Sequence, residues 1–253
     1  MSGHSKWSKI KRAKGAADVN RSQVFTKLAR ELAVAARLGD PDPTLNFRLR
    51  LAVDRARQHN MPMESIDRAI KRASSSGGDN SANLDEVVYE GYTPGGAAIM
   101  VIALTDNRNR SASEIRHAFD KHNSKLGQSG AVSWLFQLRG VITLETEPSR
   151  AEEIAMLAID MGAEEFELEG TQLELISSPE KFEELRLALE KEGVTPGSAE
   201  VTMVPKNLTA LDERSSEMTL RLMDRLEELD DVQKVFTNAD FPESVLAQYQ
   251  TAS

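Results

Sequence analysis

The feature that most restricts the fold of this 253-residue sequence is a regular alternation of strand and helix patterns between residues 141 and 204. Alternating apolar residues predict strands there, and apolar residues at three- and four-residue steps predict helices. The predicted order is strand, helix, strand, strand, helix, strand, the βαββαβ arrangement of a ferredoxin-like unit. The six expected segments are Val141 to Thr146, Ser149 to Met161, Glu165 to Glu169, Gln172 to Ser177, Pro179 to Lys191 and Glu200 to Val204.

Strands and helices on both sides of this unit lack a complete sheet of their own. Because sequence-distant strands can pair across an insertion, we predict a discontinuous α/β domain, residues 84–138 plus 206–240, with residues 139–205 inserted as an acidic ferredoxin-like domain. The expected elements of the discontinuous domain are strands over 87–92, 97–105 and 131–138, a helix beginning at the Ser111 capping box, a helix over 216–229 and a strand over 232–237.

The first 76 residues have helical periodicity instead. We expect helices around Phe25 to Ala35, over Leu45 to His59, and after Asn60 as an N-cap, packed as a small bundle. A polar stretch, Ser74 to Ser81, then predicts a linker. The predicted fold class is therefore α+β with three domains: a basic helical domain (1–76) and two α/β domains of ferredoxin-like type, the last inserted in the middle one.

The net charge of −9 averages two opposite regions of the chain. Residues 1–75 carry 16 basic and 7 acidic side chains, a net of +9, whereas the other 178 residues carry a net of −18. Such asymmetry is typical of a protein with a nucleic-acid or anionic partner. A second concentration, from Glu145 to Glu200, holds 16 acidic and 4 basic residues. It is either a solvated surface, or a docking face or guard against non-specific nucleic acid.

The N-terminal arm, which we define as Gly3 to Lys14, is the strongest candidate for nucleic-acid contact. Five cations fall within nine positions, so the arm can neutralise phosphates while an aromatic side chain stacks on an exposed base. A sequence-independent contact with the DNA backbone is equally compatible, and the plain alternative is a solvated tail. The candidate residues are His4, Lys6, Trp7, Lys9, Lys11, Arg12 and Lys14.

Two further basic groups extend this prediction. Arg108 and Arg110 lie at a strand-to-helix junction, where free helix N–H groups attract anions, although a polar turn explains the same residues. No helix-turn-helix or zinc-finger spacing occurs, so base-specific readout is not predicted. The cations expected on the exterior of the helical domain are Arg48, Arg55, Arg68, Lys71 and Arg72.

Other function classes lack sequence support. The chain has no cysteine, and His117 and His122 are not spaced as metal ligands on one helix face. No nucleophile elbow, phosphate-binding loop or kinase motif is present, so we expect no enzyme, metal or cofactor. The longest apolar run, Ala97 to Leu104, has eight residues, far below the roughly 20 of a membrane span. With no secretory signal, we expect a cytoplasmic protein.

Several motifs together resemble the YebC/PmpR family, which also includes mitochondrial translational activators of cytochrome oxidase. They lie over residues 3–136, and the length and element order agree to about residue 240. The motifs are Gly3 to Trp7, Phe25 to Leu28, Asn60 to Pro62, Ile66 to Arg72, Tyr89 to Tyr92, Leu104 to Arg110 and Leu126 to Val132.

The resemblance implies three domains and no catalytic residues. Family members are usually described as DNA-binding transcriptional regulators, and some as ribosome-associated translation factors that act at difficult stretches such as consecutive prolines. It implies nucleic-acid contact by the N-terminal arm and a second anion contact at Arg108 and Arg110. We therefore expect a regulator that binds promoter DNA; a factor that binds ribosomal RNA or the ribosome, and a protein-binding adaptor, are the alternatives. The sequence does not predict an oligomeric state.

Overall fold

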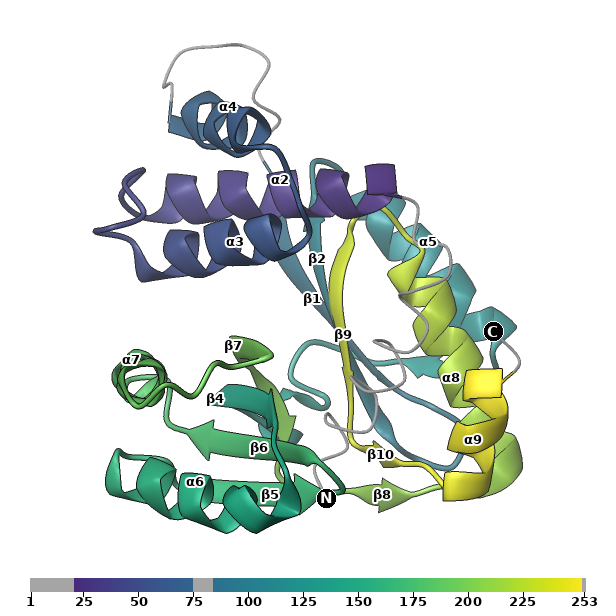
Figure 1. The fold of residues 1–253 in the computed structure, drawn as a ribbon. Coiled ribbons are helices and arrows are strands. Elements are labelled where there is room, and N and C mark those ends of the chain that lie inside the picture. The colour runs from purple at the N-terminus through teal and green to yellow at the C-terminus, as the bar shows by residue number, and fades with distance from the viewer. Residues whose placement is uncertain (1–20, 75–83, 252–253) are drawn as a thin grey trace. The chain divides into compact units, whose positions relative to one another are not determined.

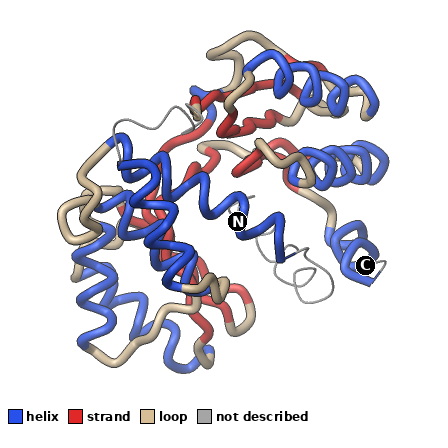
Figure 2. Tube along the Cα trace, turned by 90° about the horizontal axis from the view of Figure 1, so that it is seen from above, coloured by secondary structure: helices blue, strands red, loops and turns tan. Residues whose placement is uncertain are grey.

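The computed structural model describes residues 21–74 and 84–251 (Figure 1). The chain divides into two compact units. The smaller unit comprises Trp134–Leu208, and the larger one, among the described residues, comprises 21–133 with 209–251. Among the described residues, the range 21–74 contains helices and no strands, and the range from residue 85 onward combines strands with helices. Figure 2 draws these helices in blue and the strands in red.

Three helices form the first part of the larger unit: α2 (Arg21–Leu38), α3 (Phe47–Gln58) and α4 (Met63–Ser74). Their apolar stripes meet in one core, because each is amphipathic with small and aliphatic residues on one side. Leu32, Leu49 and Ile66, one from each helix, are almost completely buried there. The helices expected from the sequence are thus present over residues 21–74.

The boundary between α3 and α4 differs from the prediction. Asn60 was expected to cap α4, but its φ of 57° places it in the left-handed region that ends a helix. The Met61 amide donates to the Ala56 carbonyl at 2.9 Å, which closes the end of α3. Asparagine tolerates this conformation better than most residues, so the same side chain that suggested a helix start marks a helix stop.

The larger unit contains a four-stranded antiparallel sheet in the order β3-β1-β2-β9. The apolar run from Ala97 becomes an inner strand, β2, and its neighbour β9 comes from the far end of the sequence. Helix α9, beyond the predicted elements, packs against α8. The bounds are β1 (Asp85–Tyr92), β2 (Ala98–Thr105), α5 (Arg108–Lys121), β3 (Lys125–Leu126), β8 (Thr209–Ala210), α8 (Glu213–Glu227), β9 (Val232–Thr237), β10 (Ala239–Asp240) and α9 (Glu243–Thr251), with β8 and β10 paired as a separate ribbon.

The smaller unit has the ferredoxin-like topology expected from the sequence. Its antiparallel sheet has the order β5-β6-β4-β7, so the two strands that follow the helices flank a central pair. The bounds are β4 (Phe136–Glu145), α6 (Pro148–Asp160), β5 (Glu165–Glu169), β6 (Gln172–Ser177), α7 (Phe182–Lys191) and β7 (Ser198–Pro205). The α+β fold class is confirmed.

One strand was predicted as two. We expected strands over residues 131–138 and 141–146, but β4 runs without a break, after a short 3₁₀ turn, η1 (Ser133–Leu135). Gly140 lies inside β4, at a position where a Cβ would come within 2.6 Å of the Phe182 ring. The glycine permits close packing of α7 on the strand, and this requirement has no marker in the local sequence.

Candidate nucleic-acid interface

The predicted contact residues fall into two groups, those that lie outside the described residues and those that lie within them. Those of the N-terminal arm, namely His4, Lys6, Trp7, Lys9, Lys11, Arg12 and Lys14, lie outside the described residues. The cations on α3, α4 and α5 are all described, and their surroundings can be compared directly.

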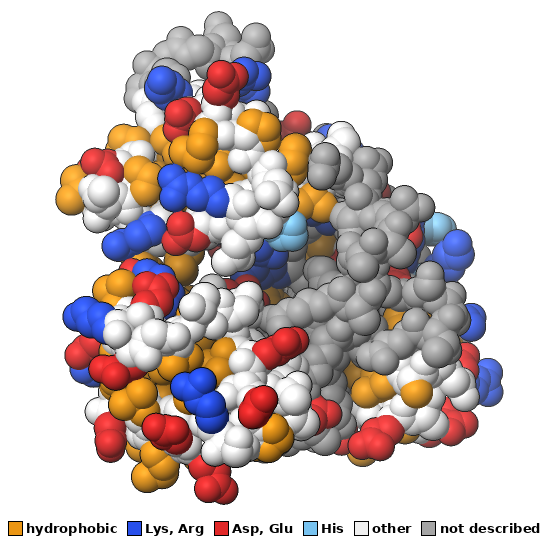
Figure 3. Space-filling model, in the orientation of Figure 1, with side chains coloured by type: hydrophobic (Ala, Val, Ile, Leu, Met, Phe, Trp, Pro, Cys, Tyr) orange, Lys and Arg blue, Asp and Glu red, His pale blue; other side chains and the backbone are white. Residues whose placement is uncertain are grey.

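Arg68, Lys71 and Arg72 are exposed on α4. Their spacing of three and four residues places them on one side of the helix. Arg68 and Arg72 form no ion pair with any other residue of the described ranges. The three cations line a shallow hollow of about 480 Å³ together with Glu64 and Asp67, and Figure 3 shows basic and acidic side chains next to each other over this helix.

Arg48 and Arg55 on α3 are engaged in ion pairs. The Arg48 guanidinium donates to Glu86 on β1, and Arg55 Nη1 lies 3.4 Å from Glu31 Oε2 on α2. Arg48 is about half exposed, so its pair is a surface contact that a phosphate can exchange with at little cost.

Helix α5 begins earlier than the sequence suggested. The expected cap was Ser111, but Asn107 caps the helix: its side-chain oxygen accepts from the Arg110 amide at 3.1 Å. Arg108 and Arg110 therefore lie in the first turn of α5 instead of the loop before it. Ser111 is buried inside the helix, where its hydroxyl donates to Asp231 at 2.6 Å.

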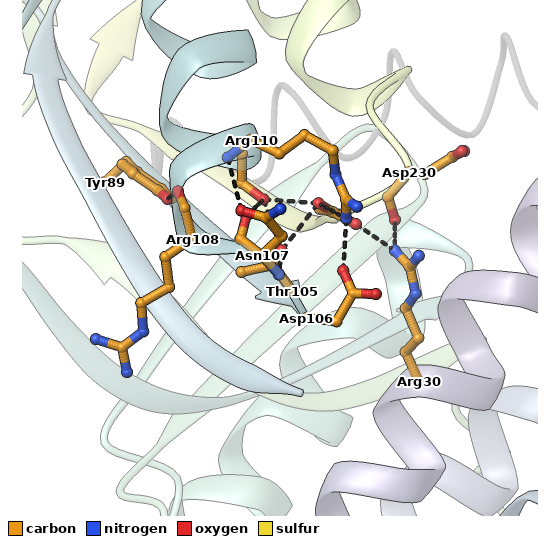
Figure 4. Close-up of polar contacts among 10 residues, drawn as sticks. Arg30, Tyr89, Thr105, Asp106, Asn107, Arg108, Arg110 and Asp230 are labelled. Carbon is orange, nitrogen blue, oxygen red and sulfur yellow. Dashed lines mark hydrogen bonds and ion pairs between the residues drawn. The ribbon is translucent and has the colours of Figure 1, made fainter. Parts of the chain in front are cut away.

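Both arginines of this turn already bind carboxylates of the same chain, and Figure 4 shows those of Arg110. Arg108 Nε donates to Asp85 Oδ2 at 2.8 Å. Arg110 Nη2 donates to Asp106 Oδ1 at 2.7 Å and to Asp231 Oδ2 at 2.9 Å. The two guanidinium groups point in different directions, so they do not form one binding site (Figure 4). Contact of these two arginines with nucleic acid stays a prediction. Such contact requires each guanidinium to leave the carboxylates that it binds in this structure.

Asp231 is the centre of the network around Arg110. Its side chain is only 5% exposed, and it accepts hydrogen bonds from Ser111, Arg110, Thr105 at 3.0 Å and Arg30 at 2.9 Å. Burial by itself would raise the pKa of Asp231, but the hydrogen bonds from Ser111, Arg110 and Thr105 and the charge of Arg30 outweigh it, so the pKa is lowered. The hydrogen bonds of Arg110 to Asp231 and to Asp106 raise the pKa of Arg110, which stays charged.

Arg30 links α2 to the sheet domain, a role that the sequence did not suggest. Its guanidinium donates to Asp231 and to the Asp230 carbonyl (Figure 4). Lys27 and Arg37, on the same helix, donate to the carbonyls of Glu227 and Leu84. These pairs join residues up to 201 positions apart, and no local pattern marks them.

The described residues contain no group of three or more His, Cys, Asp or Glu side chains that could hold a metal ion. No helix within the described ranges is long and apolar enough to cross a membrane. What the arrangement offers chemically is exposed positive charge on α4, whereas the predicted contact residues Arg48, Arg55, Arg108 and Arg110 already form ion pairs.

Two family models match the chain in succession. Residues 5–76 match the TACO1/YebC protein N-terminal domain, and residues 84–239 match the TACO1/YebC second and third domain. The gap between them, residues 77–83, overlaps the linker predicted from Ser74 to Ser81.

Relatives match over almost the whole length. A protein of Dehalococcoides mccartyi called "probable transcriptional regulatory protein" is 49% identical over 251 residues, 99% of each chain. A protein of Thermomicrobium roseum with the same description is 46% identical, over 97% of this chain and 98% of its own. The crystal structure of a conserved hypothetical protein from Aquifex aeolicus superposes with a TM-score of 0.80 at 43% identity and covers 89% of this chain and 93% of its own. The resemblance to YebC is confirmed, and the chain belongs to the TACO1/YebC family.

Proposed function

We propose that this protein regulates transcription by binding DNA through its basic N-terminal domain, without a catalytic step. The N-terminal arm makes the main contact with the phosphate backbone, and the cations of α4 extend it. The acidic part of the chain is repelled by nucleic acid, so that contact is confined to the N-terminal domain.

The observation that carries this proposal is the positive charge of the N-terminal region in a chain whose relatives are named as regulators. The first 75 residues have a net charge of +9 in a chain with a net charge of −9. Relatives that match 97–99% of the chain carry the name "probable transcriptional regulatory protein". A concentrated positive region binds a polyanion because binding releases the counterions of the polyanion. This kind of binding needs no pocket and no base-reading helix.

The geometry ranks the contacts within that region. Arg68 and Arg72 carry their charge at an exposed surface, so they can meet a phosphate without breaking a described ion pair. Arg108 and Arg110 have to exchange carboxylates for phosphates. We therefore place the arm and α4 in the interface and treat the first turn of α5 as secondary.

Crosslinking in cells, followed by sequencing of both the attached DNA and the attached RNA, tests the proposal. A transcriptional regulator enriches DNA upstream of genes. Enrichment of ribosomal RNA over such DNA overturns the proposal in favour of a translation factor, and enrichment of neither supports the protein-binding adaptor.

The second candidate, an RNA-binding translation factor, is favoured by Trp7 between the lysines of the arm. An aromatic side chain that stacks on unpaired bases contributes about 1–3 kcal/mol per base to single-strand binding and almost nothing to duplex binding. Trp7→Ala, with Trp134→Ala as the control, separates the two. A loss confined to looped or single-stranded RNA supports this candidate; equal affinity of wild type and Trp7→Ala for such RNA contradicts it.

A further inference from the structure

Helix α2 has two chemically different sides. One side contributes Leu28 and Leu32 to the core that the three helices share. Because an α-helix repeats every 3.6 residues, three cations and one valine lie together on the opposite side, which we call the cationic side of α2. Val34 is 1% exposed, so the cationic side is covered as well. The residues of this side are Lys27, Arg30, Val34 and Arg37.

The three cations of this side donate to oxygens of residues 84–133 with 209–251, which we call the sheet part of the larger unit. Three of the four acceptors are backbone carbonyls, to which water can donate once a cation leaves. Figure 4 shows the two contacts of Arg30. The pairs are Lys27 with the Glu227 carbonyl, Arg30 with the Asp230 carbonyl and the Asp231 carboxylate, and Arg37 with the Leu84 carbonyl.

The carboxylate at this contact does not depend on α2 for its charge partner. Asp231 also accepts hydrogen bonds from Arg110, Ser111 and Thr105, all of which belong to the sheet part. If Arg30 leaves, Asp231 retains the positive charge of Arg110 and the two hydroxyl donors. Separation of α2 from the sheet part therefore leaves no buried carboxylate without a partner, which is the condition that makes breaking such a pair costly.

The helices of residues 21–74, which we call the helical part, have a core of their own around Leu32, Leu49 and Ile66. Their contact with the sheet part relies on lysine and arginine side chains, and Arg48 on α3 adds an ion pair with Glu86 that is exposed on both sides. Two parts of a chain are held permanently by a large apolar interface, whereas polar interfaces allow them to move apart. The helical part is therefore built to separate from the sheet part.

We propose that the cationic side of α2 is a second nucleic-acid contact, which the sheet part covers until the phosphate backbone displaces it. Lys27, Arg30 and Arg37 then exchange mostly neutral carbonyl acceptors for charged phosphate oxygens, which form the stronger hydrogen bonds. These cations were not among the contact residues expected from the sequence. The contact rests on the proposed function, but the separation of the helical part does not.

Helix α4 gives the phosphate backbone a first point of attachment. It packs against α2 and carries Arg68 and Arg72 at its exposed surface. A nucleic acid bound there holds its neighbouring phosphates at a high local concentration near α2, so the exchange on the cationic side proceeds within one complex. A free phosphate ion lacks this attachment and should not open the contact.

Distance measurement by pulsed dipolar EPR spectroscopy tests the separation. The chain has no cysteine, so spin labels attach only to introduced ones, here Gln58→Cys on α3 and Ser113→Cys on α5, both at exposed positions. Saturating duplex DNA should shift most molecules of the full-length protein to a longer distance, and inorganic phosphate should not. The control pair, Ser113→Cys with Glu243→Cys, lies within the sheet part and should keep its distance. An unchanged distance for the first pair in the presence of bound DNA overturns the proposal.

Charge-removing variants test the contact itself. Lys27→Gln, Arg30→Gln and Arg37→Gln together should reduce the slope of log affinity for duplex DNA against log salt by about 2.7, because three phosphate contacts are lost. The matched control removes three exposed cations of the sheet part, through Arg116→Gln, Lys121→Gln and Lys125→Gln, and should leave the slope almost unchanged. Equal slopes for wild type and the α2 variant overturn the proposal, and so do equal reductions in the two variants, because only net charge would then matter. Thermal unfolding followed by circular dichroism verifies that each variant folds.

The two proposals fail in distinguishable ways. If duplex DNA binds with the salt dependence expected for the N-terminal arm, while the label distance and the slope of the α2 variant do not change, the second contact is wrong and the proposed function stands. If the protein binds no DNA, the proposed function and the contact on α2 are both wrong. The separation then still has its own test, because salt at about 1 M screens the ion pairs between the parts and should lengthen the label distance without any nucleic acid.

Discussion

The cations of α4 and those in the first turn of α5 look alike in the sequence but differ in what surrounds them. Arg68 and Arg72 are exposed and form no ion pair within the described ranges. Arg108 and Arg110 bind three aspartates between them. The difference teaches that a count of basic residues predicts a positive region, but only the fold decides which charges are available to a partner.

The contrast has a physical origin. The α4 cations lie on the outer side of an amphipathic helix, whose inner side is fixed by Ile66. The α5 turn lies beside the buried carboxylate of Asp231, which needs donors to offset the cost of its burial. Arg110 therefore serves first to stabilise the fold, and Arg68 serves no such purpose.

The largest expected effect is on the α5 side of the comparison. Asp231→Ala should lower the free energy of unfolding by about 3 kcal/mol, because it leaves two guanidinium groups and two hydroxyls without their shared acceptor. Urea denaturation measures this loss. Asp230→Asn, at the exposed neighbour, is the control and should change stability by less than about 0.5 kcal/mol. A small loss for Asp231→Ala would mean that Arg110 is as available as Arg68.

The second prediction concerns binding. Arg68→Gln with Arg72→Gln should lower the affinity for duplex DNA about tenfold and reduce the salt slope by about 2, because each charge lost is one phosphate contact fewer. Arg108→Gln should change affinity less than twofold, since its charge is engaged by Asp85. Fluorescence anisotropy at several salt concentrations measures both variants. The reverse ranking would refute the distinction between the two groups.

The smallest effect is a dependence on pH. The pKa of Asp231 lies below its ordinary value of 3.8, so the carboxylate contributes stability at higher pH, and this contribution is lost as the pH falls through its lowered pKa. The stability difference between the wild type and Asp231→Asn should stay constant from pH 7 to about 5 and shrink below about pH 4. Urea unfolding at each pH measures it. A difference that grows with acidity would reverse the sign and contradict the network.

Periodicity predicted most of the fold, because regular elements depend on local patterns. The ferredoxin-like topology, the helices of residues 21–74 and the late strand β9 all followed from the spacing of apolar residues. The predictions were wrong at positions where the local pattern does not reveal the backbone conformation or the packing of neighbouring elements. Asn60 ends a helix through a left-handed backbone, and Gly140 lies inside β4, where the close approach of Phe182 leaves no room for a Cβ.

The candidate site was predictable only in part. The exposed cations of α4 follow from helical periodicity, since residues opposite the apolar stripe face solvent. The pairing of Arg30 and Arg110 with Asp231 joins segments that are far apart in sequence. A carboxylate in a two-aspartate turn has no local feature that reveals its burial, so the engagement of the α5 arginines became visible only in the folded chain.

The measurement that tests the central claim most directly is the salt dependence of DNA binding for the full-length chain and for residues 15–253. The shortened chain retains every described residue and lacks the cations Lys6, Lys9, Lys11, Arg12 and Lys14. If these five neutralise phosphates, the slope of log affinity against log salt should differ by about 4.5 on duplex DNA, or about 3.5 on a single strand. Equal slopes for the two chains would contradict binding through the N-terminal arm.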